Sequence, residues 1–532
     1  MLEEIGCEDS QTRERWWKGN SKNMKSDSGA TTSIWMATTA GIPAEGKLLE
    51  DTSADVCIVG AGIAGMTTAY LLAREGKRVI VLDDGSIGGG MTGRTTAHLV
   101  NALDDRFFEL ERLHGEKGAR LAAESHTAAI ARIETIVKEE GIDCEFERLD
   151  GYLFVPPGES KEILDRELAA LHRAGLTDTE LLPRAPLDFY DTGVCIRFPR
   201  QGQFHPLKYL AGLAGSITRD KGVIYTGTHA SKIEGGESAR IETSGGAIVS
   251  AAAVVVATNT PVNDLFAIHI KQAAYLTYVM GVRIPRGSVT KALYWDTPDP
   301  YHYVRLESSS VEKHDVLIVG GEDHKSGQAD DAGERFARLE SWTRARFPMI
   351  ERIEYRWSGE VLEPIDGLAF IGHNPLDQDN VYIATGDSGN GMTHGTIAGI
   401  LLTDLIVGRE TQWAALYDPS RKTLRALPAF AKENINVAEQ YADWVTPGEV
   451  EDAGEIAPRT GAIVRRGLTK VAAYKDDNNK LHERSAVCPH LGCIVDWNSL
   501  EKTWDCPCHG SRFDAYGCVI NGPANHDLPV ID

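Results

Sequence analysis

The 532-residue sequence lacks both a long apolar run and an excess of basic residues. No apolar stretch reaches the roughly 18 residues that a membrane-spanning helix needs. The 77 acidic residues outnumber the 55 basic ones and leave a net charge of −22, which would repel nucleic acid and anionic lipid surfaces. The sequence therefore predicts no transmembrane segment and no nucleic-acid partner.

Cysteine is also scarce, and no secretory signal is visible. Nine cysteines are too few for a disulfide scaffold in a chain of this length. The N-terminus lacks the order of basic, apolar and small residues that marks a signal peptide, so we predict a cytoplasmic protein. The cysteines without a partner pattern are expected to be buried or incidental thiols: Cys7, Cys57, Cys144, Cys195 and Cys518.

The first 50 residues show no sustained hydrophobic period and are rich in Ser, Thr, Lys and Gly. This composition predicts a mostly disordered leader. Met24 and Met36 are alternative start positions.

Near the C-terminus, two short segments contain residues that bind metal. The first runs from Cys488 to His490, and after fifteen further residues the second runs from Cys506 to His509. Two cysteines and two histidines are the ligands of a [2Fe–2S] cluster in which histidines replace two cysteines on one iron. A zinc site would accept the same ligands. The order Cys-x-His, the Gly-Ser after the last histidine and a spare cysteine pair favour the cluster, with the ligands Cys488, His490, Cys506 and His509.

These segments resemble the cluster-binding loops of Rieske iron–sulfur domains of the cytochrome bc and b6f type, and Gly522-Pro523-Ala524 resembles a further loop of that domain. The spare cysteines are Cys493, after the first ligand pair, and Cys508, within the second. Their positions suit a disulfide between the loops, which would be a local exception in a cytoplasmic protein. The family usually has a tyrosine two residues after the serine, where this chain has Phe513. Because that tyrosine donates a hydrogen bond that raises the potential, the resemblance implies a reduction potential below the respiratory range.

A second motif lies where the ordered chain is expected to begin. An apolar strand at 55–59 is followed by Gly-x-Gly-x-x-Gly, a helical stretch, a second apolar strand at 78–82 and an acid 21 residues after Gly62. The glycines allow a tight turn against a pyrophosphate at the helix N-terminus, and the acid accepts from a ribose hydroxyl. The predicted dinucleotide site comprises Gly60, Ala61, Gly62, Ile63, Ala64, Gly65 and Asp83.

Two further Gly-rich segments indicate FAD. Residues 88–98 are rich in Gly and Thr, and 381–393 form another strand and Gly loop before a helix, which places a positive helix end beside an anion. With the strand at 254–258, they resemble the FAD-dependent D-amino-acid oxidase, glycine oxidase and sarcosine oxidase superfamily over about residues 50–410. The FAD contacts that the resemblance implies are Arg94 and Thr95 near the pyrophosphate and ring, Ala230 at the adenine, and Gly389, Asn390, Gly391, Met392 and Thr393 beside the ring.

No second nicotinamide fingerprint follows, so we predict that the electrons do not come from NAD(P)H. The predicted fold class is an α/β Rossmann-like FAD-binding domain with an antiparallel-sheet substrate domain, plus a small all-β Rieske domain. In chain order we expect a flexible leader at 1–50, an oxidoreductase unit at 51–445, a linker at 446–460 and the Rieske domain at 461–532. Within the oxidoreductase unit we expect FAD-binding pieces at about 51–100, 225–265 and 355–410, substrate-domain pieces at about 144–210 and 271–355, and closing helices at 407–445.

The substrate contacts are less defined by the sequence. His98 is expected close to the flavin ring, either in the site or as a structural histidine. The residues that either line a pocket or serve sheet packing and surface charge are Tyr275, Tyr278, Tyr301, Tyr303 and Arg305. We assign no general base, because the superfamily passes hydride from the substrate carbon to the flavin while the protein supplies orientation and charge stabilisation.

The two motifs together suggest a function. We predict an FAD-dependent enzyme that oxidises a C–N bond of a small amine or amino acid and passes electrons singly through the cluster to an external partner. That partner would be a ferredoxin-like or cytochrome-like protein or a quinone. Two alternatives stay open: a reductase whose electrons enter through the cluster, and a Rieske module that acts as a redox sensor or docking module.

Overall fold

The first sheet is built on the strand, turn and helix that the glycine motif predicts. The computed structural model describes residues 26–263, 268–308 and 313–531. Strand β1 (Thr52–Val59) is parallel to β10 (Ile248–Val256) on one side and to β2 (Val79–Leu82) on the other. The four residues of β2 are all buried, as expected for a parallel strand covered on both faces.

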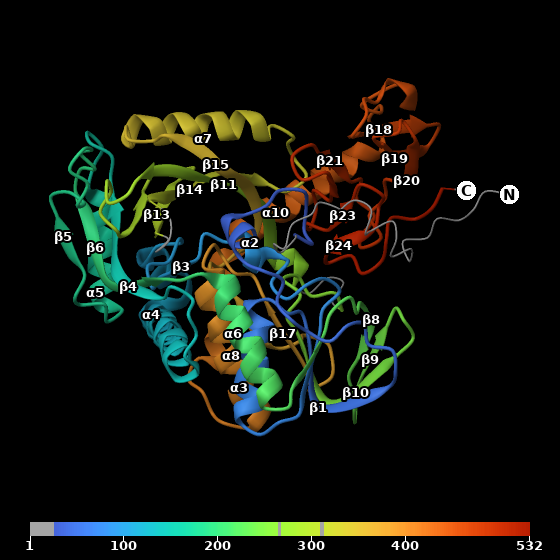
Figure 1. The fold of residues 1–532 in the computed structure, drawn as a ribbon, viewed down its shortest axis with the longest axis horizontal. Coiled ribbons are helices and arrows are strands. Elements are labelled where there is room, and N and C mark those ends of the chain that lie inside the picture. Colours follow the sequence, from blue (N-terminus) through green and yellow to red (C-terminus); the bar gives the residue numbers. More distant parts are fainter. Residues whose placement is uncertain (1–25, 264–267, 309–312, 532) are drawn as a thin grey trace.

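Further strands extend this sheet to the order β16-β17-β10-β1-β2-β7, with a hairpin of β8 and β9 added at β10. Helices α3, α6 and α8 lie side by side on one face (Figure 1). The bounds are β7 (Val223–Tyr225), β8 (Ala230–Glu234), β9 (Ala239–Thr243), β16 (Phe370–His373), β17 (Val381–Thr385), α3 (Ile63–Arg74), α6 (Pro206–Arg219) and α8 (Gly391–Val407).

The second sheet has nine strands in the order β15-β11-β14-β13-β12-β4-β6-β3, with β5 paired to β6. All of its pairs are antiparallel except β12 with β4, which confirms the predicted antiparallel-sheet domain. Helix α7 (Ala332–Arg346) covers one face of β11 and β14 (Figure 1). The strand bounds are β3 (His98–Leu99), β4 (Glu147–Phe154), β5 (Glu180–Leu182), β6 (Cys195–Gln203), β11 (Gln272–Pro285), β12 (Leu293–Asp296), β13 (His302–Ser308), β14 (His314–Lys325) and β15 (Arg352–Pro364).

The C-terminal module consists of two small antiparallel sheets, in agreement with the all-β prediction. One sheet contains β18 (Thr460–Arg466), β19 (Thr469–Lys475) and β20 (Leu481–Ser485). The other contains β21 (Asp496–Asn498), β22 (Thr503–Asp505), β23 (Arg512–Asp514) and β24 (Val519–Asn521). In Figure 1 this module lies beside the end of the second sheet and above β8.

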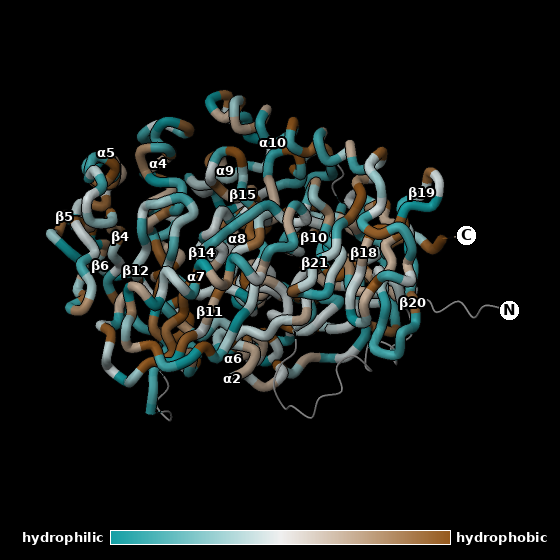
Figure 2. Tube along the Cα trace, turned by 90° about the horizontal axis from the view of Figure 1, so that it is seen from above, coloured by the Kyte–Doolittle hydropathy of each residue, from teal (hydrophilic) through white to brown (hydrophobic). Residues whose placement is uncertain are grey.

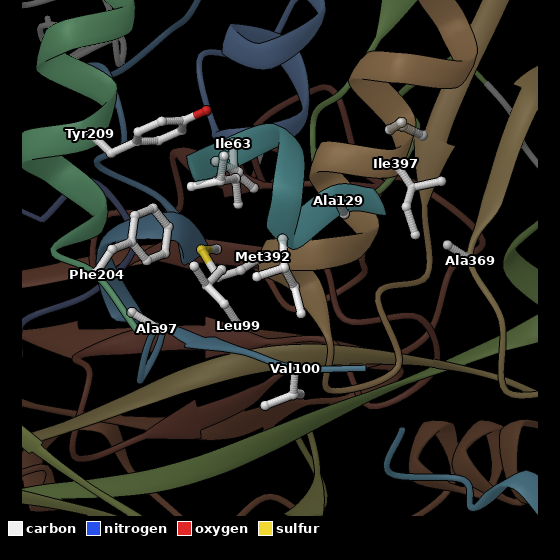
Figure 3. Close-up of a cluster of buried hydrophobic side chains, with 14 of the residues drawn as sticks. Ile63, Ala97, Leu99, Val100, Ala129, Phe204, Tyr209, Ala369, Met392 and Ile397 are labelled. Carbon is white, nitrogen blue, oxygen red and sulfur yellow. The ribbon is translucent and has the colours of Figure 1, made fainter. Parts of the chain in front are cut away.

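One large apolar core joins the helices of the first sheet to the edge of the second. Figure 3 shows Ile63 of α3, Tyr209 of α6 and Ile397 of α8 in this cluster, together with Ala129 of α4 (Phe107–Glu140). Ile397 is fully buried, and burial of such a side chain contributes about 2 kcal/mol. The core therefore fixes α3 and α8, whose N-termini both face the cavity described below.

The leader predicted at 1–50 is wrong from residue 26 onward; residues 1–25 lie outside the described residues. Residues 26–50, which we call the N-terminal strap, contain the short helix α2 (Ile34–Thr38), capped by Ser33. Trp35 and Met36 are fully buried, and the Trp35 indole nitrogen donates to the Thr95 carbonyl at 2.6 Å. The strap buries single side chains rather than one face of a long element, so it shows no hydrophobic period in the sequence.

The linker predicted at 446–460 is also packed rather than extended. The Glu449 amide donates to the Ile463 carbonyl at 2.7 Å, and Val450 bridges to Val464. Ala453 and Ile456 join an apolar cluster with residues of β18 and β19. The C-terminal module therefore begins near residue 446, because apolar residues spaced between prolines and glycines add to its core.

The closing helices predicted at 407–445 are present, and they reach the C-terminal module. Helix α10 (Leu427–Gln440) buries none of its residues fully and alternates hydrophilic and hydrophobic stretches (Figure 2). The remaining short elements are α5 (Glu162–Arg173), α9 (Ala414–Tyr417), η1 (Met91–Arg94), η2 (His269–Lys271), η3 (Leu424–Ala426), η4 (Tyr441–Trp444) and η5 (Ala453–Glu455). Within the described ranges, no helix combines the length and apolar character needed to cross a bilayer.

Candidate functional site

The turn after β1 has the close contacts that the glycine motif predicts. Gly60 adopts a φ of +108°, and a Cβ there would collide with the carbonyl oxygen of Ala257. A Cβ at Gly65 would collide with the carbonyl oxygen of Gly60. Gly62 caps α3 without a side-chain hydrogen bond. The Ile63 amide donates to the Thr92 hydroxyl at 3.0 Å, so the amides that follow it are the ones that can receive an anion.

Asp83 ends β2 at the same edge of the sheet. One carboxylate oxygen accepts from the Ala61 amide at 2.6 Å and the other from the Gly85 amide at 2.8 Å. Burial and the neighbouring Asp84 raise the pKa of Asp83 to about 7. The carboxyl group is therefore fixed at the position from which the acid of a dinucleotide site binds a ribose hydroxyl.

A cavity of about 310 Å³ extends from this turn along α8 to the second sheet, within the size range of small-molecule sites. Most of the predicted cofactor residues line it: Gly60, Gly62, Ile63, Ala64, Asp83, Arg94, Thr95, Ala230, Gly389, Asn390, Gly391 and Met392. Ala61, Gly65 and Thr393 do not. The Thr393 hydroxyl instead lies 2.8 Å from His126 Nδ1.

Arg94 differs most from its predicted surroundings. Its guanidinium is fully buried and pairs through two nitrogens with both carboxylate oxygens of Glu501, at 2.9 and 3.2 Å. Further bonds go to Ser26, Thr31 and the Ser358 carbonyl. Although burial opposes ionisation, Arg94 and Arg512 lower the pKa of Glu501 to about 2. Arg94 borders the cavity, but its charge is neutralised by the C-terminal module, and its contact with a pyrophosphate stays a prediction.

The loop before α8 presents its helix N-terminus to the cavity. Gly389 has a φ of +69°, and a Cβ there would collide with a carboxylate oxygen of Asp104. Asn390 caps this seventeen-residue helix. The orphan amides and the positive end of a helix of this length stabilise negative charge, which fits the expected position beside a reduced flavin ring.

The far end of the cavity is rich in carboxyl groups and aromatic rings. The Tyr301 hydroxyl donates to Asp104 at 2.6 Å, and the hydroxyls of Thr277 and Tyr303 lie 2.7 Å apart. Asp323 is half-buried beside them, and one of its oxygens is buried without a hydrogen-bond partner among the described residues. Burial, with Asp104 nearby, raises the pKa of Asp323 to about 7.

Of the predicted substrate contacts, Tyr301, Tyr303 and His98 line the cavity. Tyr278 packs in the core under α7 instead. Arg305 is buried and donates to carbonyls of residues 96, 97 and 204 and to Glu307. Tyr275 is not among the cavity residues. No sequence motif marks the acidic residues of this cavity, which belong to ordinary strands and loops: Asp104, Asp323, Glu360 and Glu363.

The two cysteine–histidine segments come together at one end of the C-terminal module. Each is a tight loop: the Gly492 amide donates to the Cys488 carbonyl at 3.0 Å, and the Gly510 amide to the Cys506 carbonyl at 3.1 Å. The thiols of Cys488 and Cys506 are buried and hydrogen-bond to each other. The rings of His490 and His509 lie 5.0 Å apart between centroids.

The chemistry of these residues fits a [2Fe–2S] cluster. His509 Nδ1 is buried without a partner among the described residues. Burial, and then His490, lower the pKa of His509 to about 3, so the imidazole is neutral at pH 7 as a metal ligand must be. The predicted disulfide joins Cys493 and Cys508. Their sulfur atoms lie close to that of Cys506, but the disulfide removes two of these three from the set of ligands.

Two observations around the cluster were not predicted. Cys518 is disulfide-bonded, so the expectation of an incidental thiol is wrong there. His269, from the oxidoreductase unit, packs edge-to-face against His490 at 4.9 Å and against His509 at 6.2 Å. The histidine edge of the cluster site therefore faces the oxidoreductase unit. Phe513 is fully buried and carries no hydroxyl. The lower reduction potential expected of a cluster without the tyrosine hydroxyl stays a prediction.

The fold and this pair of sites define a flavin-dependent oxidoreductase joined to an iron–sulfur module. The family model for FAD dependent oxidoreductases matches residues 55–405, and that for the Rieske [2Fe-2S] domain matches residues 446–532. The chain belongs to the FAD-dependent oxidoreductase family and carries a C-terminal Rieske domain. Its cofactors are FAD and a [2Fe–2S] cluster.

Several known proteins resemble it. YhfW of Bacillus subtilis (strain 168), named as a Rieske 2Fe-2S iron–sulfur protein, is 32% identical over 93% of this chain and 96% of its own. Gamma-glutamylputrescine oxidoreductase of Escherichia coli (strain K12) is 27% identical over 71% of this chain and 91% of its own. The structure of glycine oxidase from Geobacillus kaustophilus superposes with a TM-score of 0.59 at 20% identity, covering 70% of this chain and 99% of that one. At 20% identity, the likeness to glycine oxidase shows the fold alone.

Proposed function

We propose that this protein oxidises a C–N bond of a cationic amine and passes the electrons through its Rieske module to an external one-electron acceptor. The observation that carries the proposal is that the two cofactor sites adjoin. Glu360 lines the flavin cavity, and its free carboxylate oxygen would lie 3.2 Å from a Cβ at Gly510, the residue after the cluster ligand His509. The wall of the flavin cavity therefore borders a cluster-binding loop, which favours direct electron transfer between the two sites.

The acidic wall of the cavity supports an amine as the substrate. Eight carboxyl groups line the cavity: Asp27, Asp83, Asp84, Asp104, Asp323, Glu360, Glu363 and Asp387. Among the described residues that line it, Arg94 is the one arginine or lysine, and its charge is paired with Glu501. A substrate carboxylate would find no unpaired arginine or lysine among these residues, whereas an ammonium group would find a carboxylate at Asp323 once this side chain is ionised.

Aromatic side chains strengthen this preference. Tyr301, Tyr303 and Trp295 line the same end of the cavity as Asp323, and aromatic faces attract cations. Burial, and then Arg305, lower the pKa of His98 to about 3, so this histidine adds no positive charge at neutral pH. The likeness to gamma-glutamylputrescine oxidoreductase agrees with an amine-derived substrate.

When bound, FAD accepts hydride and so takes two electrons from the substrate carbon. The residues of the chain hold the reactants. Asp323 and the paired hydroxyls of Thr277 and Tyr303 would bind the substrate ammonium, and the N-terminus of α8 would stabilise negative charge on the reduced ring. The residues of the site therefore position the substrate and stabilise charge, and none of them is assigned as a nucleophile.

The external acceptor would meet the protein where the cluster loop approaches the surface. The Tyr441 hydroxyl donates to the Leu491 carbonyl at 2.7 Å, and the Trp444 indole to the Gly492 carbonyl at 2.9 Å. Both side chains are more than one-third exposed, and Val445 beside them is largely exposed. An apolar patch of this kind suits a ferredoxin-like or cytochrome-like protein or a quinone.

Asp323→Asn is expected to lower kcat/KM for a diamine about 10- to 100-fold, because it removes a charged hydrogen bond to the ammonium. In the wild type, kcat/KM should rise with pH through about 7, since burial keeps Asp323 protonated below that pH and the ionised form attracts the cation. The variant should lose this rise. The measurement is the rate of anaerobic flavin bleaching, with an amine whose ammonium titrates far above this range.

Glu322→Gln is the matched control, since Glu322 is the preceding residue of β14 but bonds to Arg338 away from the cavity. It should leave the pH profile of kcat/KM in place. An Asp323→Asn protein with the wild-type profile would show that the acidic wall does not select the substrate.

The function itself is tested anaerobically, by mixing the protein with pooled amines and amino acids while recording flavin absorbance and the EPR signal of the reduced cluster. Flavin bleaching by amines together with growth of the EPR signal is the expected result. Bleaching by amino acids alone would overturn the substrate class. A cluster that only dithionite reduces would favour electron entry through the Rieske module, or a sensor role.

A further inference from the structure

The last loop of the Rieske module forms part of the wall of the flavin cavity. The segment belongs to β24 and the loop that follows it, more than 400 residues after the glycine turn. Its cavity-lining residues are Val519, Ile520, Asn521, Gly522, Ala524 and Asn525. We call residues 519–525 the Rieske wall. In a flavin enzyme without a Rieske module, other residues would have to form this side of the cavity, or the cavity would be open to solvent there.

Asn525 ties the Rieske wall to the strand expected at the adenine. Its side-chain amide donates to the carbonyls of Ala230 and Ser231, at 3.0 and 3.1 Å. The backbone carbonyl oxygen of Asn525 lies 3.2 Å from His229 Nε2, and His229 Nδ1 lies 3.3 Å from a carboxylate oxygen of Asp84. Since Asp84 follows Asp83, this network spans the cavity at its dinucleotide end.

A second contact holds the wall nearer the middle of the cavity. The Asn521 amide donates to Glu360 at 2.7 Å. A Cβ at Gly522 would lie 3.1 Å from the Thr260 carbonyl oxygen, so the two backbones are closely packed there. The wall is therefore joined to the oxidoreductase unit by side chains on both flanks of the cavity.

We propose that the Rieske module completes the FAD site, with Asn525 as a positioning residue at the dinucleotide end, so that bound FAD and the docked module stabilise each other. A ligand that contacts two units favours the state in which they are joined, and this linkage is reciprocal. FAD should hold the module in place, and the module should slow the release of FAD. This inference is independent of the substrate and of the direction of electron flow.

The test compares full-length Asn525→Ala protein, loaded with both cofactors, with wild type and with Asn478→Ala. Asn478 is an exposed asparagine in the β19–β20 turn of the same module and is not among the residues that line the cavity. Release of FAD after dilution is followed by flavin fluorescence. Asn525→Ala should release FAD about tenfold faster, because two backbone carbonyls lose their donor, whereas Asn478→Ala should stay within about twofold of wild type.

A second measurement separates this effect from simple misfolding. The temperature at which the cluster absorbance is lost is recorded with and without excess FAD, with circular dichroism to verify folding. FAD should raise this temperature by several degrees in the wild type and by less in Asn525→Ala. Unchanged FAD release in a folded Asn525→Ala protein, or a cluster-loss temperature that is insensitive to FAD in the wild type, would overturn the proposal.

Discussion

Replacement of Glu501 by alanine is expected to lower the free energy of unfolding of the Rieske module by about 3–5 kcal/mol. Glu501 and Arg94 are both fully buried where the module meets the flavin-binding unit. Removal of one partner leaves the other charge without compensation in a medium that solvates it poorly. The Ser358 hydroxyl would also lose its acceptor, which now lies at 2.6 Å. Urea denaturation, followed through the cluster absorbance, measures the change.

Asp477→Asn is the control for this prediction. Asp477 forms an ion pair with Arg459 within the same module, but both side chains are about two-thirds exposed. Exposed pairs of this kind contribute about 0–1 kcal/mol. If Glu501→Ala destabilised the module no more than Asp477→Asn does, the buried pair would not hold the two units together.

The same ion pair sets the acid stability of the module. The pKa of Glu501 is lowered to about 2, below its value of about 4.3 in an unfolded chain. Its stabilising contribution is therefore complete above the unfolded pKa and is lost as the pH falls from there through 2. Glu501→Gln should flatten this part of the stability profile. A profile that matches the wild type between these values would assign the acid sensitivity to other carboxylates.

Replacement of the cluster ligand His490 by alanine is expected to lower turnover with a one-electron acceptor by about 100-fold or more. Changes to residues that merely support a metal ligand cost about 10- to 100-fold, and loss of a ligand removes the cluster itself. Bleaching of the flavin by amine should fall by much less, since the substrate end of the cavity contains no residue of the cluster loops. Stopped-flow absorbance of FAD-replete protein separates the two rates.

His482→Ala is the matched control, since His482 belongs to the same module but contacts Asp476 and Tyr516 rather than the cluster loops. It should retain turnover with the acceptor. Equal turnover in His490→Ala and wild type would mean that electrons leave the flavin without the cluster, as in an oxidase that reduces oxygen directly.

The features that a sequence can predict from pattern alone are those set by neighbouring residues, and the cofactor contacts of these residues stay predictions. The turn at Gly60 and the acid at Asp83 lie within one strand–helix–strand unit, and the cluster ligands lie within 22 residues of each other. Backbone geometry and ligand chemistry constrain such short segments on their own. The disulfide between Cys493 and Cys508 is part of the same local arrangement.

These sequence patterns could not predict the contacts between distant segments. The family resemblance placed Arg94 near the pyrophosphate and ring, and nothing in the sequence indicated its partner Glu501, which is 407 positions away. His269 and Asp323 gave no signal, since a histidine in a short turn and an acid in a strand are ordinary residues. Docking of the two units gives Arg94 and His269 their neighbours, whereas Asp323 meets Thr277 and Asp104 through the folding of the oxidoreductase unit itself.

The N-terminal strap has a consequence for how the protein is made. The Thr31 amide donates to a carboxylate oxygen of Glu501 at 3.0 Å across 470 positions of sequence, and Arg512 donates to the Ser28 carbonyl at 3.0 Å. Ribosomes add about 5–20 residues per second. The partners of the strap are therefore synthesised about half a minute to a minute and a half after the strap itself. During that time a nascent chain exposes the strap, and Arg94 lacks its counter-ion. The Rieske module thus covers a segment made about 470 positions earlier, and a chain that stops before the module would leave Arg94 without its counter-ion.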